Sequence, residues 1–245
     1  MTISFKQWLL ESKGIRLTDE IEQQIDAVYP KIHQAAVQSK QSGEEIDVGS
    51  IQYTDQYFKG RNRTIDISVI NDPDQNFDGD FNPVMGVRIN VAHIKPEEIT
   101  PRWIRRLLVH EVGIHSQDPK ISDFNTFSKM GGKHYDNSGG IAYYTNPLEF
   151  DAYTGQIVDS IIKLAKISKN PAETNKMLDD TLAFVKNPEE GKANQTYGII
   201  GDPDYWKSFH IYYMHGSPDQ KRRMYQRIYK AVIDAKGILT ATLNK

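Results

Sequence analysis

The first clear pattern in the chain is an amphipathic helix after Thr18, which suits the N-cap position because its hydroxyl can accept a backbone hydrogen bond. Pro30 is expected to kink or split this helix. The stretch 38–45 is polar and contains a glycine, which indicates a loop. The apolar face of the helix consists of Ile21, Ile25, Val28 and Ile32.

A region of alternating apolar and polar residues then predicts three strands, at 51–53, 64–70 and 87–91, which should form a small half-buried sheet. Between the last two strands, the segment 74–79 matches the first half of a calcium-binding EF loop. The twelfth position of that loop is Met85 instead of a bidentate glutamate, so a turn-rich hairpin loop is the favoured interpretation.

Helical patterns dominate from residue 100 onward. Helices are predicted over about 101–118, 146–167 and 170–185, and from Ser217 to the end, each opened by a capping residue and a proline. We therefore predict an α+β fold, with a small, mostly antiparallel sheet packed on the 101–118 helix and a helical C-terminal half. The expected division is a helical segment at 1–45 and one domain at 46–245, or a single domain throughout. The core-facing residues of the last helix are Met224, Ile228, Val232 and Ile233.

Composition narrows the possible chemistry. The 245 residues carry a net charge of -2 and are 38% hydrophobic and 25% charged, so nothing in the overall charge favours nucleic acid as a partner. No run approaches the roughly 18 to 20 apolar residues of a membrane span, and residues 1–13 lack the apolar stretch of a secretory signal. The chain is therefore expected to be cytosolic or packaged, and not to be exported by that route. The chain has no cysteine, so a metal site must use histidines and carboxylates.

The strongest candidate for chemistry is the segment 110–115, His-Glu-Val-Gly-Ile-His. In the zinc peptidase signature H-E-x-x-H the histidines are four residues apart and lie about 40° from each other around the helix. Here His110 and His115 are five residues apart, which on a regular helix separates them by about 140°. A one-turn π-bulge would restore a shared face, and Gly113 is where the distortion should cost least.

The order of elements extends this motif. A strand, a helix with His-Glu…His, a loop, and a helix that begins Pro-Leu-Glu-Phe-Asp-Ala at 147–152 resemble the zinc metallopeptidases of the zincin class, gluzincin type, in a phage-encoded form. The resemblance covers roughly residues 85 to 165, with H-E-x-x-x-H as a variant of the family motif. It implies a hydrolase, most simply a peptidase, that binds Zn²⁺ and acts on a peptide or protein.

The same resemblance implies roles for individual residues. His110, His115 and Glu149 would hold the metal, and Glu111 would be the general base that deprotonates the metal-bound water. Capping of the helix that begins at Pro147 is an alternative explanation for Glu149, because Glu149 occupies the N3 position.

Other residues of the region could share these roles. Asp118 or Asp151 could ligate the metal instead of Glu149, or orient a ligand histidine. Tyr144 is the preferred donor to the oxyanion, and Tyr143 and His134 are alternatives.

The N-terminal segment contains a second motif that bears on where the protein acts. The segment 5–11, Phe-Lys-Gln-Trp-Leu-Leu-Glu, resembles the targeting peptides of internal head proteins in tailed phages, in which the prohead protease cuts after Glu11. A helix that docks on its own domain is the alternative. Phage head proteins are accordingly possible partners, and a non-catalytic virion protein on a decayed zincin scaffold is the alternative function. A helical adaptor with no metal site is a third.

Two further motifs have structural explanations. His210 and His215 repeat the five-residue spacing without an acid after the first histidine, which favours a mostly buried aromatic helix with hydrogen-bonded histidines. The basic segment 221–223, Lys-Arg-Arg, is typical of a solvated helix face, and a phosphate contact is the weaker interpretation.

Overall fold

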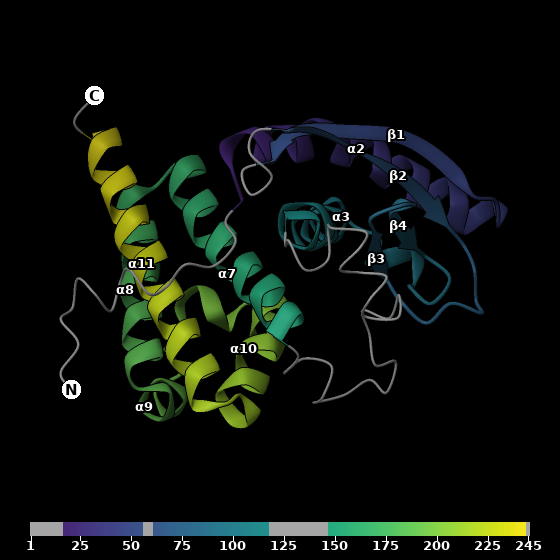
Figure 1. The fold of residues 1–245 in the computed structure, drawn as a ribbon. Helices are drawn as coiled ribbons and strands as arrows, with labels where there is room; N and C mark the ends of the chain where they lie inside the picture. Colours follow the sequence, from purple (N-terminus) through teal and green to yellow (C-terminus); the bar gives the residue numbers. More distant parts are fainter. Residues whose placement is uncertain (1–16, 56–60, 118–146, 244–245) are drawn as a thin grey trace. The chain divides into compact units, whose positions relative to one another are not determined.

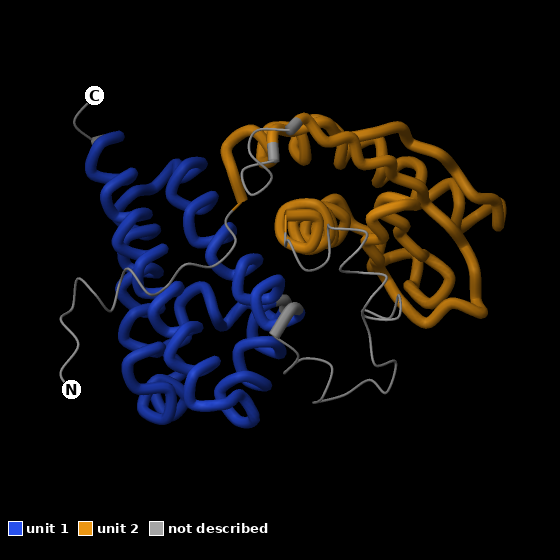
Figure 2. Tube along the Cα trace, in the orientation of Figure 1, with its two compact units in different colours: residues 1–14, 139–245 blue, residues 15–138 orange. Residues whose placement is uncertain are grey.

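A computed structural model describes residues 17–55, 61–117 and 147–243. The chain divides into two compact units, which Figure 2 shows in orange and blue. One unit spans residues 15–138, and the other comprises residues 1–14 and 139–245. The expected division into segments 1–45 and 46–245 stays a prediction.

The first unit begins with helix α2, Asp19–Ser42. The Thr18 hydroxyl accepts a hydrogen bond from the backbone N–H of Ile21, as expected of an N-cap. Pro30 lies on the exposed side of a helix that continues through it, so the predicted split is wrong and the kink stays a prediction. The helix also continues through residues 38–42, which were expected to form a loop, and it ends at Gly43 with a left-handed φ of 77°.

The sheet of this unit has the order β1-β2-β4-β3 (Figure 1). The pairs β1–β2 and β3–β4 are antiparallel and β2–β4 is parallel, which confirms the mostly antiparallel sheet. A register shift between Asp47 and Gly49 marks a bulge near the start of β1. The strands are β1 (Ile46–Asp55), β2 (Arg61–Ile70), β3 (Gly79–Asn82) and β4 (Gly86–Asn90).

β3 lies in the stretch that was expected to be only a turn-rich loop. The buried Asn90 organises the preceding loop through its side chain, which donates to the carbonyls of Asp72 and Gln75. Its side-chain oxygen in turn accepts from the backbone N–H of Asp72. The loop is therefore stabilised by an amide side chain.

Two helical segments cover the sheet. α2 packs along β1 and β2, as Figure 1 shows, and Arg105 joins α2 to the next helix through ion pairs with Glu22 and Asp26. The second segment changes its helical type three times along its length. It consists of the 3₁₀ turn η1 (Pro96–Glu98), helix α3 (Pro101–Leu108), the π-helical turn η2 (Val109–Ile114) and the 3₁₀ turn η3 (His115–Gln117).

All the regular elements that the structure describes in the second unit are helices. The predicted α+β class with a helical C-terminal half is therefore confirmed. Every α-helix of its described part begins with a proline, whose missing N–H costs nothing at that position. The elements are α7 (Pro147–Ile167), α8 (Pro171–Lys186), α9 (Pro188–Ala193), η4 (Gly198–Gly201), α10 (Pro203–His215) and α11 (Pro218–Leu243).

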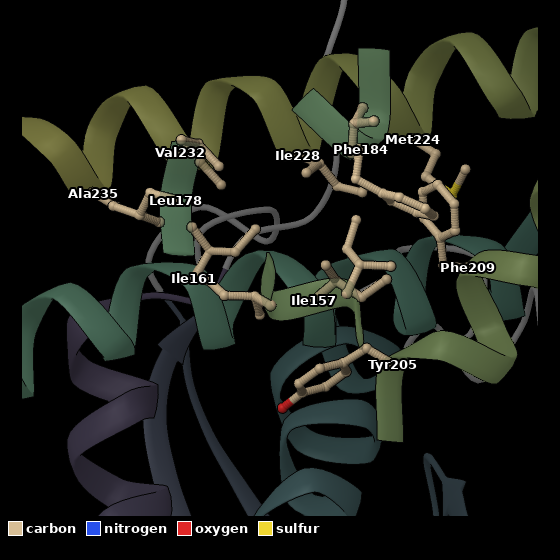
Figure 3. Close-up of a cluster of buried hydrophobic side chains, with 14 of the residues drawn as sticks. Ile157, Ile161, Leu178, Phe184, Tyr205, Phe209, Met224, Ile228, Val232 and Ala235 are labelled. Atoms are coloured by element: carbon tan, nitrogen blue, oxygen red, sulfur yellow. The ribbon is translucent and has the colours of Figure 1, made fainter. Parts of the chain in front are cut away.

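The core of this unit is formed by side chains from α7, α8, α10 and α11 that point toward one another (Figure 3). Met224, Ile228 and Val232 belong to it, as predicted. Ile233 is 47% exposed, so its assignment to the core was wrong. Within the described residues, no helix is both long and apolar enough to cross a membrane.

Candidate metal centre

The helix that carries the His-Glu…His motif changes from α to π at the motif itself. The backbone N–H of His115 donates to the carbonyls of both Glu111 and His110, and the second of these bonds spans five residues. The π turn absorbs the extra residue and brings the two imidazole rings to a centroid distance of 4.6 Å, with an interplanar angle of 77°. The predicted bulge is confirmed.

Gly113 lies in this turn for a reason of packing. A Cβ atom at Gly113 would lie 2.5 Å from the Cδ1 atom of Leu17, which precedes helix α2. The absence of a side chain at Gly113 therefore lets Leu17 approach the π turn closely.

The ligand atoms of His110, Glu111 and His115 all lie within 4.8 Å of one another. In a tetrahedral site, two Zn–N bonds of about 2.0 to 2.1 Å place the two nitrogens about 3.3 to 3.4 Å apart, so ligand atoms separated by up to 4.8 Å would have to close by up to about 1.5 Å to share one ion. The three side chains are only 4%, 3% and 1% exposed. Among the described residues this is the one group of three or more such side chains that could hold a metal, and two imidazole nitrogens with a carboxylate fit zinc.

Side chains from the following 3₁₀ turn and from the sheet hold the end of the π turn. Ser116 donates from its hydroxyl to the Val112 carbonyl at 2.5 Å, and Gln117 donates from its side-chain amide to the Gly113 carbonyl. Tyr53 and Arg63, from β1 and β2, both donate to the Ser116 carbonyl, at 3.3 Å and 2.9 Å. These bonds supply partners for carbonyls that the end of a helix leaves without intrahelical donors.

Glu111 lies against the beginning of β3. A Cβ atom at Gly79 would lie 3.2 Å from the Glu111 carboxylate oxygen Oε1 and 3.1 Å from a methyl carbon of Leu107. The glycine therefore leaves space for the carboxylate next to the strand, where a larger side chain would press on it.

Glu149 lies in the first turn of α7 and is 1% exposed. Asp151, the alternative ligand on the same helix, accepts hydrogen bonds at one carboxylate oxygen from Arg223 at 2.8 Å and Arg227 at 2.9 Å. That oxygen serves a two-arginine ion pair, which favours a structural role for Asp151 and leaves Glu149 as the better candidate on α7.

Several predicted site residues lie outside the described residues. These are Tyr144, Tyr143, His134 and Asp118, together with the N-terminal segment 1–11.

The structure also places His210, His215 and the basic segment 221–223. His210 stacks on Trp206 at 5.4 Å between ring centroids, and α10 is helical as predicted. His210 is half-buried and His215 is exposed at the end of that helix, so the expected burial holds for Phe209 and Tyr212 and not for the two histidines. Within the basic run, Arg223 pairs with Asp151 and is only partly solvated.

Sequence reasoning missed the residues that support the motif: Leu17, Tyr53, Arg63, Ser116 and Gln117. Ser116 and Gln117 directly follow His115, where a helix end needs side-chain partners for its carbonyls, and that position was the available signal. Tyr53 and Arg63 are more than fifty residues away in the sequence and gave none.

No protein-family model, curated protein or solved structure matches the chain. The resemblance to zincins therefore rests on the residues of the motif and on their geometry. These establish a buried His-Glu-x-x-x-His group compatible with metal binding.

Proposed function

We propose that the protein is a zinc-dependent hydrolase, and specifically a peptidase, in which His110 and His115 are metal ligands and Glu111 is the general base. The observation that carries the proposal is the π turn, which places the two imidazole rings 4.6 Å apart although their sequence spacing departs from H-E-x-x-H by one residue. On a regular helix two residues five apart lie about 140° from each other, whereas the π turn brings both imidazole rings to one face, as two ligands of one ion require.

The donor set favours zinc over the harder cations. Both histidines offer imidazole nitrogens, whereas calcium and magnesium sites are built from oxygen ligands. When bound, zinc would supply Lewis acidity toward a substrate carbonyl. The burial of His110 and His115 would keep competing water from the ligand atoms.

Glu111 supports the hydrolytic part of the proposal. Its carboxylate belongs to the same group of atoms within 4.8 Å, so it would lie within reach of a water bound at the site and could take a proton from it. The same carboxyl group would then deliver the proton to the leaving amine of a cleaved peptide bond.

The third ligand in this proposal is Glu149. This role rests on the place of Glu149 in the zincin-like order of elements along the sequence. Tyr144 completes the proposed set as the donor to the oxyanion, and this role rests on the sequence alone.

Zinc binding and hydrolysis are tested separately. Metal analysis and competition with a chelator should show about one zinc per chain in the wild type and none in His110→Ala. His93→Ala is the matched control, because His93 is an exposed histidine of the same unit and should leave zinc binding unchanged.

Glu111→Gln should keep the zinc and lower the cleavage of a peptide library by about 10² to 10⁴, the usual contribution of a general base. A wild type that binds no zinc after supplementation would overturn the proposal. Zinc binding with cleavage that does not depend on Glu111, or with no cleavage, would favour the non-catalytic virion protein on a decayed scaffold.

A phage setting remains part of the proposal on sequence grounds alone. Mass spectrometry of purified particles should find an N-terminus at Ser12 if residues 1–11 are a targeting peptide. An intact Met1 in the particles would contradict it.

A further inference from the structure

We infer that Tyr53 and Arg63 are positioning residues for the metal site, because they fix Ser116 and thereby the neighbouring ligand His115. The inference rests on the proposed function, in which His115 binds zinc. It adds two residues of the sheet that no spacing in the motif indicates.

The contacts converge on Ser116, which is fully buried. The Tyr53 hydroxyl lies 2.8 Å from the Ser116 hydroxyl and 3.3 Å from its carbonyl oxygen, and the Tyr53 side chain is 2% exposed. Arg63 donates from Nη1 to the same carbonyl at 2.9 Å. Ser116 is thus hydrogen-bonded at its hydroxyl and at its carbonyl by side chains from the neighbouring strands β1 and β2.

The positions of the protons follow from these distances. The Ser116 hydroxyl has one proton, and its bond to the Val112 carbonyl at 2.5 Å uses it. The contact at 2.8 Å is then donated by the single proton of the Tyr53 hydroxyl, and the longer contact of that hydroxyl with the Ser116 carbonyl, at 3.3 Å, is the weaker branch of the same bifurcated bond. A chain of hydrogen bonds therefore runs from Tyr53 through Ser116 to Val112, a residue inside the π turn.

The chain has a geometric consequence for His115. A π turn is rare and competes with the regular helix, in which a ligand five residues from His110 would lie about 140° away. Ser116 follows His115 directly in the chain. Hydrogen bonds that fix the Ser116 hydroxyl and carbonyl therefore also restrict the backbone dihedral angles of His115. The sheet in this way holds the π register that the shared face requires.

Tyr53→Phe and Ser116→Ala remove the two hydroxyl groups with little change in shape. Loss of a group that orients a metal ligand typically costs about 10- to 100-fold in metal affinity, so we expect the Kd for zinc to rise about tenfold in each variant. Arg63→Lys replaces the guanidinium group with an ammonium group, which should bond the Ser116 carbonyl less well. The Kd for zinc should therefore rise, but by a smaller factor.

Ser39→Ala is a matched control. Ser39 is a fully buried serine of the same unit, and its hydroxyl donates to a backbone carbonyl, that of Glu44, at 2.6 Å. Ser39→Ala and Ser116→Ala should therefore lower the urea midpoint of the metal-free protein by similar amounts, whereas only Ser116→Ala should weaken zinc binding.

The experiment measures the Kd for zinc by chelator competition and the urea midpoint without metal, for the wild type and each variant. A zinc Kd that rises in Tyr53→Phe and Ser116→Ala, and stays within about twofold in Ser39→Ala, supports the inference. Wild-type zinc affinity in both Tyr53→Phe and Ser116→Ala overturns it and leaves the proposed function intact if His110→Ala still abolishes binding. If Ser116→Ala does not fold, Tyr53→Phe decides the question alone. Absence of zinc binding in the wild type would overturn the proposed function itself.

Discussion

The close approach of Leu17 to Gly113 gives a quantitative test of how the π turn is packed. In Gly113→Ala the new Cβ atom would lie 2.5 Å from the Leu17 Cδ1 atom, and carbon atoms in contact normally lie about 3.5 to 4.0 Å apart. Leu17 would therefore have to move by about 1 Å or more.

Two free-energy terms oppose each other in this variant. Overpacking costs about 1 to 3 kcal/mol, and the lower end applies because the colliding atom is a terminal methyl of a half-buried side chain. Replacement of a helical glycine by alanine returns about 1 kcal/mol. We expect Gly113→Ala to change the free energy of unfolding by about 1 kcal/mol or less in the wild-type background.

The same substitution in a Leu17→Ala background should be stabilising by up to about 1 kcal/mol, because the collision has been removed. The coupling energy between the two sites should then be about 1 to 2 kcal/mol. Urea unfolding of the wild type, both single variants and the double variant measures it. Additive effects of the two substitutions would show that Leu17 does not restrict position 113, and the packing explanation of Gly113 would fail.

Three other substitutions test particular contacts. Arg227→Met should lower the free energy of unfolding by about 2 kcal/mol, since Asp151 keeps only its second arginine, and an unchanged urea midpoint would contradict this ion pair. Gly86→Ala should cost more than about 3 kcal/mol, because Gly86 has a φ of 80° and its Cβ would lie 2.2 Å from a carbonyl oxygen of β2; a wild-type melting temperature would refute it. A hydrogen bond to Glu189 raises the pKa of Tyr213 from 10.0 to about 12, so its contribution to stability is complete below about pH 10 and is lost as the pH rises through about 12. Glu189→Gln should shift the tyrosinate absorbance of Tyr213 toward pH 10, with Tyr213→Phe identifying the signal; no shift would contradict the bond.

Local signals predicted most of the helices. Proline at the first position and a capping residue before it depend only on neighbours in the sequence, and the helices at Pro101, Pro171 and Pro218 begin where these signals place them. Pro30 misled the same reasoning, because a proline on the exposed side of a long helix loses only one hydrogen bond while the buried face stays intact. β3 was missed because Gly79–Asn82 is short, and its pairing with β4 makes it a strand.

In the candidate site, too, some features could be predicted from neighbouring residues and others depend on distant contacts. The π turn could be predicted because the spacing of His110 and His115 leaves no other way to bring them to one face. The bond between Tyr53 and Ser116 joins residues 63 positions apart, and no periodicity in the sequence indicates such a contact. The sequence therefore identifies the groups that can do chemistry, and the tertiary structure identifies the groups that hold them in place.

The sheet order also bears on how the folded chain meets other copies of itself. Among the strands that the structure describes, β1 ends the sheet on one side, and an edge strand of ten residues is an open template for pairing with a second chain. The bulge between Asp47 and Gly49 interrupts the regular spacing of its edge, and at the other end the Glu20 carboxylate accepts from the backbone N–H of Thr54. The edge is thus distorted at one end and occupied at the other, which disfavours growth of the sheet into aggregates.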